Sequence, residues 1–155
     1  MIRPLPACLL GVALSGVAAA PVGAHSPDEA LALVERAADH IREKGRLQAF
    51  ADFNRPNGGF VDGDLFVFCT DSANVVLANG GNPMLVGKNM SAVRDGEGRL
   101  PAADLFRIAQ TKGRGWYEYL WPNPVRRRIE RKVAYAIRID DKTMCAAGYY
   151  KPNSP

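Results

Sequence analysis

Residues 115–139, GWYEYLWPNPVRRRIERKVAYAIRI, contain two runs with the alternating pattern of β-strands. Residues 116–121 form the first run, residues 132–139 form the second, and a turn-forming Asn-Pro pair follows the first run at positions 123–124. Successive side chains of a strand point to opposite faces, so each run is expected to have two different sides. The segment therefore predicts two strands that carry most of the aromatic side chains of this part of the chain.

The alternation assigns these side chains to faces. On the first strand, one face carries Tyr117, Tyr119 and Trp121. On the second strand, Lys132 shares its face with two alanines, whereas the opposite face, which includes Tyr135, has the composition of a core. If the turn brings the Lys132 face against the Tyr119 and Trp121 face, the result is a cup with aromatic walls and one ammonium group.

The other elements follow from periodicity and from residues that start or stop them. Ser26, Pro27 and Glu29 form a helix start signal with a capping box, and Gly45 can end that helix. Further helical segments are predicted at 46–54 and 101–113, and further strands at 64–71, 74–79 and 144–150. Two groups of antiparallel strands with helices around them indicate a single α+β domain.

The N-terminus has the features of a secretory signal peptide. Arg3 supplies the positive start, residues 7–20 are apolar without a charge, and Val22-Gly23-Ala24 offers small residues for cleavage. We predict a signal peptide over 1–24, cleavage near Ala24, and a mature domain over 25–155 in the periplasm or secreted. The alternative is an uncleaved membrane anchor, for which the apolar run is shorter than the ~20 residues of a spanning helix.

Charge and cysteine content narrow the class further. The chain has 20 basic and 16 acidic residues, and loss of Arg3 with the signal peptide lowers the net charge from +4 to +3. This mild charge suits small anions better than nucleic acid, which is not expected as a partner. The chain has no CxxC motif and no Cys/His cluster, so neither a metal site nor a cofactor is predicted.

An ordered set of motifs resembles a known family, the single Cache domains of extracytoplasmic sensors (sCache_2-like). The set consists of Gly-Lys-Asn at 87–89, Gly-Trp-Tyr-x-Tyr-x-Trp at 115–121, Asn123-Pro124, Lys132 with Tyr135, and Gly148-Tyr149-Tyr150. No single element is diagnostic, but the order is hard to obtain by chance. The resemblance covers roughly residues 47–151.

This resemblance implies a PAS-like five-stranded antiparallel sheet with a long N-terminal helix packed across one face and a small-ligand pocket on the other. Members often bind short carboxylates such as acetate, propionate, pyruvate or lactate, and usually lie between two membrane helices of a receptor. This sequence shows no second membrane span and ends at Pro155, directly after the domain. A stand-alone secreted binding protein is therefore expected, which presents its ligand to a membrane receptor or histidine kinase.

The candidate ligand-binding residues come from the aromatic strands and from the family pattern. They are Lys132, Tyr119, Trp121, Tyr117, Trp116, Tyr135, Lys88 and Asn89. An ammonium and a phenol would donate to a carboxylate while the rings exclude water. The alternatives are that the aromatic residues are plain sheet core, that Lys132 is solvated, and that Lys88 and Asn89 only stabilise a loop.

The resemblance also concerns the two cysteines outside the signal peptide. Cys69 lies in the first predicted strand and Cys145 in the last, which are antiparallel neighbours in a PAS-like sheet. Export favours oxidation of paired thiols, so a disulfide is expected. The alternative is two buried cysteines that pack without a bond.

Two other functions remain open. One is an interaction or structural module whose pocket is vestigial. The other is an enzyme that acts on a small organic acid, but the strand region has no histidine and the chain has no GxSxG or HExxH motif. An enzyme is therefore not expected.

Overall fold

The computed structural model describes residues 24–152, so the predicted signal peptide lies almost wholly outside the described residues. The described residues contain three α-helices: α1 (Pro27–Lys44), α2 (Arg46–Phe53) and α3 (Pro101–Lys112). A short 3-10 helix, η1 (Pro83–Leu85), lies between α2 and α3 in the chain. None of the helices in this part of the chain is long and apolar enough to span a bilayer.

The strands form one antiparallel sheet. They are β1 (Val61–Asp62), β2 (Leu65–Asp71), β3 (Val76–Asn79), β4 (Arg114–Asn123), β5 (Arg128–Asp140) and β6 (Thr143–Tyr150). The spatial order is β1-β2-β6-β5-β4, and β3 pairs with β2 on the same side as β1. The first and last long strands, β2 and β6, are therefore neighbours in the middle of the sheet.

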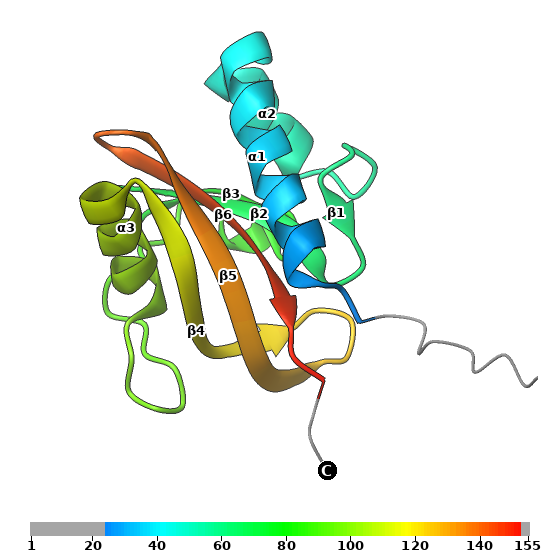
Figure 1. The fold of residues 1–155 in the computed structure, drawn as a ribbon, viewed down its shortest axis with the longest axis vertical. Coiled ribbons are helices and arrows are strands. Elements are labelled where there is room, and N and C mark those ends of the chain that lie inside the picture. Colours follow the sequence, from blue (N-terminus) through cyan, green and yellow to red (C-terminus); the bar gives the residue numbers. More distant parts are fainter. Residues whose placement is uncertain (1–23, 153–155) are drawn as a thin grey trace, which may run out of the picture.

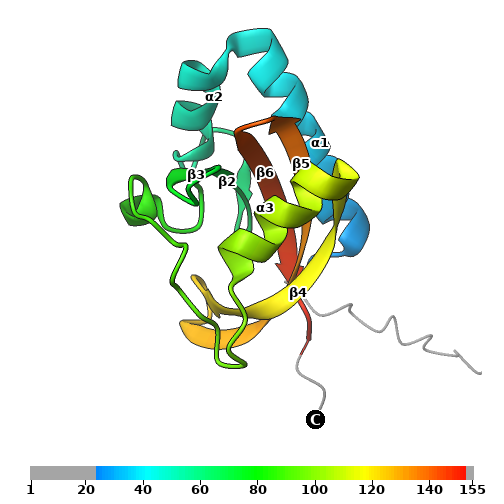
Figure 2. The ribbon, with the colours of Figure 1, turned by 90° about the vertical axis from the view of Figure 1, so that its left-hand side faces the viewer.

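Helices cover both faces of this sheet (Figures 1 and 2). On one face α1 and α2 pack over alternate residues of the central strands, including Val67 of β2 and Ile137 of β5. On the other face Leu105 and Ala109 of α3 pack against Ala134, Ala136 and Ala146. These small residues allow α3 to approach the strands closely. The two faces of the sheet thus belong to two separate cores.

The start and end of α1 agree with the sequence signals. The Ser26 hydroxyl accepts a hydrogen bond from the Glu29 backbone N–H, and the Glu29 carboxylate accepts one from the Ser26 backbone N–H. Gly45 ends the helix with φ at 78°, a value that favours glycine. Leu33, Val34 and Ile41 face the sheet. The capping box therefore fixes where the long helix begins on its face.

The expected α+β, PAS-like architecture is confirmed, with one correction to the strand count. The sheet has six strands instead of five, because β1 adds a two-residue strand beside the start of β2. Two residues are too few to produce an alternating pattern. The register sets Cys69 of β2 directly opposite Cys145 of β6, and a disulfide joins them, facing α1.

Candidate ligand-binding site

The pairing of β4 with β5 creates the proposed cup. Tyr119 lies directly opposite Lys132 in the antiparallel register, and residues that pair in this way point to the same face. Trp121 is two residues further along β4 and shares that face. The turn at 123–128 therefore brings the face of β4 that carries Tyr119 and Trp121 beside the face of β5 that carries Lys132.

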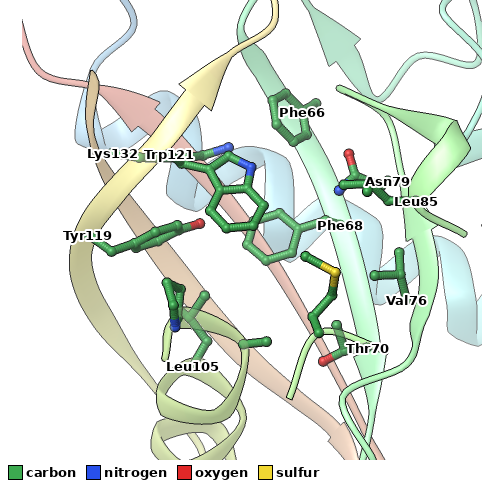
Figure 3. Close-up of a pocket in the computed structure, with 13 residues that line it drawn as sticks. Phe66, Phe68, Thr70, Val76, Asn79, Leu85, Leu105, Tyr119, Trp121 and Lys132 are labelled. Atoms are coloured by element: carbon green, nitrogen blue, oxygen red, sulfur yellow. The ribbon is translucent and has the colours of Figure 1, made fainter. Parts of the chain in front are cut away.

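A cavity lies on this face, between β2 and β4 and beneath α3 (Figure 3). Its volume of about 40 Å³ exceeds the roughly 10–15 Å³ that one water needs, so it has room for about three waters or a few heavy atoms of a ligand. It is lined by Phe66, Phe68, Thr70, Val76, Asn79, Leu85, Met90, Pro101, Ala102, Leu105, Tyr119, Trp121 and Lys132. The walls are thus mostly aromatic and aliphatic.

Lys132 is the one lysine or arginine that lines the cavity, and it is 1% exposed. Its Nζ lies 3.6 Å from the centre of the Phe66 ring, 5.0 Å from that of Tyr150 and 5.3 Å from that of Phe68. Within residues 24–152 the Lys132 ammonium group forms no ion pair and no hydrogen bond. Cation–π contacts contribute about 2 kcal/mol when desolvated, which is less than the hydration free energy that the ammonium group loses on burial. The ammonium group therefore lacks a full counterpart.

Burial changes the protonation of this lysine. Loss of water lowers the pKa of Lys132 from 10.5 to about 7, and the negative charge of Asp64 opposes this decrease only in part. The lysine is consequently half charged near neutral pH. An anion that enters the cavity would favour the charged form and raise this pKa again.

Three further polar side chains of the cavity have hydrogen-bonding atoms without a partner among the described residues. The Tyr119 hydroxyl has no acceptor, and burial raises the pKa of Tyr119, so this group remains an O–H donor. Asn79 uses Oδ1 to accept from the N–H groups of Gly81 and Asn82, which leaves its amide nitrogen free. The buried Thr70 hydroxyl is also unpaired. Unpaired buried polar groups are rare, so a ligand or waters are expected here.

A buried polar network lies beside Lys132. The Asn123 side chain donates to Asp64 and to Glu130 at 2.8 Å each, and Arg128 donates to Glu130 at 2.6 Å. Tyr150, which covers Lys132, donates to the Pro122 carbonyl at 2.7 Å. These carboxylates are held by other partners and do not pair with the lysine, so the ammonium remains available to an incoming anion.

The other predicted site residues lie elsewhere. Tyr117 stacks on Tyr119 but donates its hydroxyl to Asp104 of α3 at 2.5 Å, and it does not line the cavity. Trp116 and Tyr135 lie on the α1 face, where their ring centres are 4.7 Å apart. Both were predicted as ligand-binding residues, but strand alternation places them on the faces opposite Tyr119 and Lys132, and neither lines the cavity.

Lys88 and Asn89 also lie outside the cavity lining. The Asn89 side chain donates to the Ala73 carbonyl and accepts from the Ser91 N–H, while the Lys88 carbonyl accepts from the Val76 N–H. Both side chains are exposed. The geometry matches the alternative reading of these two residues, in which they hold the loop after β3 against that strand.

The β2 side of the cavity was not identified from the sequence. Phe66, Phe68 and Thr70 alternate with Leu65, Val67 and Cys69, which pack under α1. Because β2 is buried on both faces, its two sets of side chains do not differ in polarity. β2 reaches the site because it pairs with β6, which in turn pairs with β5, and no local sequence pattern records this arrangement.

The absence of a side chain at Gly81 leaves room for the Phe66 ring. A Cβ atom at Gly81 would lie 2.4 Å from Cε1 and Cζ of Phe66, so Gly81→Ala must displace this ring. We expect the substitution to lower the free energy of unfolding by about 1–3 kcal/mol and to weaken ligand binding, because the ring contacts the Lys132 ammonium. Urea denaturation monitored by tryptophan fluorescence would measure the stability.

Gly96→Ala is the matched control for this substitution. Its Cβ would meet only the end of the Leu120 side chain, at 3.3 Å, so a near-neutral effect is expected. Equal denaturation midpoints for the two variants would contradict the supporting role of Gly81.

Comparison with known proteins identifies the family. An antiparallel sheet with a long helix on one face and a cavity on the other is the arrangement of a PAS-like sensor domain. The family model described as Single Cache domain 2 matches residues 23–141, and the chain belongs to this family. No curated protein sequence matches the chain.

Solved structures support the same fold. A methyl-accepting chemotaxis protein from Vibrio parahaemolyticus RIMD 2210633 is similar with a TM-score of 0.69 and 20% identity, over 79% of this chain and 86% of that one. A periplasmic sensor domain of a chemotaxis protein gives 0.64 and 22%, over 81% and 90%. A Cache chemosensory domain, described for its recognition of carboxylic acids, gives 0.68 and 19%, over 81% and 92%.

Proposed function

We propose that this domain binds a short-chain carboxylate in the cavity on the α3 face and acts as an extracytoplasmic sensor domain. The observation that carries the proposal is the Lys132 ammonium group, 1% exposed in an aromatic cavity and without an anionic partner among the described residues. A carboxylate is the smallest organic group that supplies the missing charge. Acetate, propionate, pyruvate and lactate are the candidate acids, and acetate, the smallest of them, fits the cavity of about 40 Å³ best.

The expected affinity is modest. Charge-assisted hydrogen bonds from Lys132 and Tyr119 contribute roughly 1.5–3 kcal/mol each, and each buried carbon adds about 0.8 kcal/mol. After the cost of immobilising the ligand, the total is consistent with a dissociation constant in the micromolar range. The amide nitrogen of Asn79 and the Thr70 hydroxyl provide further polar contacts.

The proposed cellular role is supported by the family and by similar structures. Similar structures include a periplasmic sensor domain of a chemotaxis protein and a Cache domain that recognises carboxylic acids. We infer that the domain works outside the cytoplasm after removal of residues 1–24, and that it passes ligand occupancy to a membrane receptor or histidine kinase. The chemistry requires neither a cofactor nor an enzymatic step.

Thermal stability in the presence of ligands tests the proposal. A ligand at 100 times its dissociation constant adds about 2.7 kcal/mol, which raises the melting temperature by several degrees. We expect such an increase with at least one of acetate, propionate, pyruvate and lactate. Tyr119→Phe should then weaken binding of that acid by roughly 10- to 100-fold, because it removes one donor to the carboxylate.

Tyr117→Phe serves as the matched control, since its hydroxyl contacts Asp104 and not the cavity. We expect this variant to bind the acid as the wild type does. If no carboxylate changes the melting temperature at millimolar concentration, the proposal is wrong and the interaction module with a vestigial pocket is favoured. Conversion of the bound acid would instead indicate an enzyme.

A further inference from the structure

A second, larger hollow adjoins the cavity at the end of the edge strand β4. Its volume is about 540 Å³, and it extends past Trp121 toward the hairpin between β4 and β5. Five residues line both hollows: Phe66, Asn79, Leu85, Met90 and Trp121. These shared residues form the boundary between the small cavity and the larger groove.

The groove is walled mainly by hydrocarbon. Its remaining walls are Gly81, Asn82, Val93, Arg94, Asp95, Gly96, Leu120, Pro122, Pro124 and Ile129. Ile129 is 60% exposed and Val93 is 37% exposed. Large apolar side chains that remain this open to water beside a pocket are typical of ligand-binding surfaces.

Two charged residues line the groove, Asp95 and Arg94. Asp95 accepts hydrogen bonds from the backbone N–H groups of Glu97, Arg99 and Leu120, and Arg99 also donates to it. Burial raises the pKa of Asp95, but these bonds outweigh it and lower the pKa to about 2. Arg94 donates to the Gly98 carbonyl. Arg94 forms no ion pair among the described residues, but it is exposed to water, whereas Lys132 is 1% exposed. Lys132 is therefore the cation that gains most from a carboxylate, while the groove offers mainly apolar contact.

We propose that the groove holds the hydrocarbon tail of a longer monocarboxylate whose headgroup occupies the Lys132 cavity. This inference rests on the proposed function. The cavity accommodates only a few heavy atoms, so carbons beyond the third must pass the shared side chains into the groove. The ligand class then includes straight-chain acids of about five to eight carbons.

The boundary between the two hollows includes side chains that are partly exposed. Met90 and Trp121 are both partly exposed, and an unbranched methionine side chain changes rotamer easily. The backbone that carries Met90 is fixed, because its N–H donates to the Asn74 carbonyl and Lys88 is bonded to Val76. Rotation of the Met90 side chain is the movement by which this boundary would admit a tail.

A chain-length series tests this inference. Isothermal titration of the full-length domain at pH 6.5 would compare the straight-chain acids from acetate to octanoate. We expect affinity to rise by about fourfold for each methylene group beyond propionate, so that hexanoate binds at least tenfold more tightly than propionate and displaces it competitively. The alcohol 1-hexanol, which lacks the carboxylate, should not compete with propionate.

Ile129→Ser should remove most of the gain for hexanoate and leave propionate affinity unchanged. Val125→Ser is the matched control, because Val125 is also 60% exposed in the same hairpin but does not line the groove. If propionate binds but hexanoate binds no better, or if Ile129→Ser behaves like the control, the tail site is refuted and the proposed function stands. If no acid of any length binds, both proposals fail.

Discussion

Lys132→Met is expected to reduce carboxylate affinity by two orders of magnitude or more and to stabilise the ligand-free protein near neutral pH. Methionine is unbranched and one atom shorter than lysine, so it keeps most of the apolar stem but removes the charged Nζ that contacts Phe66. A bound carboxylate would then be a buried, unpaired anion, and breaking one half of a buried ion pair costs roughly 3–5 kcal/mol. In the empty cavity the same substitution removes a poorly solvated cation.

The pH dependence of stability has a defined sign. Because burial lowers the pKa of Lys132 from 10.5 to about 7, the unfolded chain binds a proton more readily than the folded one. This lysine therefore makes the folded state progressively less stable as the pH falls from about 10.5 to about 7, with little further change below that. At 1.36 kcal/mol per pKa unit the effect is at most roughly 5 kcal/mol.

Ligand affinity, unlike stability, should decrease as the pH rises above 7. The anion requires the charged lysine, and carboxylic acids remain ionised between pH 6 and pH 9. We therefore expect a constant dissociation constant below pH 7 and a rise approaching tenfold per pH unit above it, until the pKa of the liganded state is reached. Wild type would bind a proton together with the acid in this range.

Urea denaturation at several pH values and isothermal titration would measure both effects on the same samples. The difference in unfolding free energy between Lys132→Met and wild type should be largest below pH 7 and should shrink as the pH rises. Lys88→Met, an exposed lysine outside the cavity, should change neither property. Retention of wild-type carboxylate affinity in Lys132→Met would contradict the site.

Local signals in the sequence were sufficient for most of the fold. The capping box at Ser26 and Glu29 marked the start of α1, and alternation located β4 and β5 within a few residues. The missing strand, β1, has only two residues and depends on pairing with Leu65 and Phe66, which no local pattern records. Segments whose conformation is imposed by a distant partner are the ones that sequence reasoning misses.

The candidate site was predicted in part for a similar reason. Tyr119, Trp121 and Lys132 could be grouped because a short turn joins their strands and because a lysine that shares its strand face with two alanines is unusual. Asn79 comes from β3, far along the chain, and its role in the cavity depends on pairing with Phe68. The unpaired state of the Thr70 hydroxyl is likewise visible only when its neighbours are known.

The disulfide links β2, which lines the cavity, to its neighbour β6. Cys69 lies between Phe68 and Thr70, whose side chains point into the cavity, and Cys145 lies on the central strand β6. Removal of the disulfide is therefore expected to affect the position of β2, the strand that carries Phe68 and Thr70. It also releases a constraint between residues 76 positions apart, and the entropy of closing so long a loop is large.

We expect the Cys69→Ala, Cys145→Ala double variant to lose about 4 kcal/mol of unfolding free energy, since the unfolded chain gains the freedom that the bridge removes. Guanidinium denaturation of the oxidised wild type, the reduced wild type and the double variant would measure the loss. Agreement between the last two would assign it to the bond and not to the packing of two sulfur atoms. Two free thiols in the denatured, unreduced protein, or equal midpoints for all three, would show that no bridge stabilises the domain.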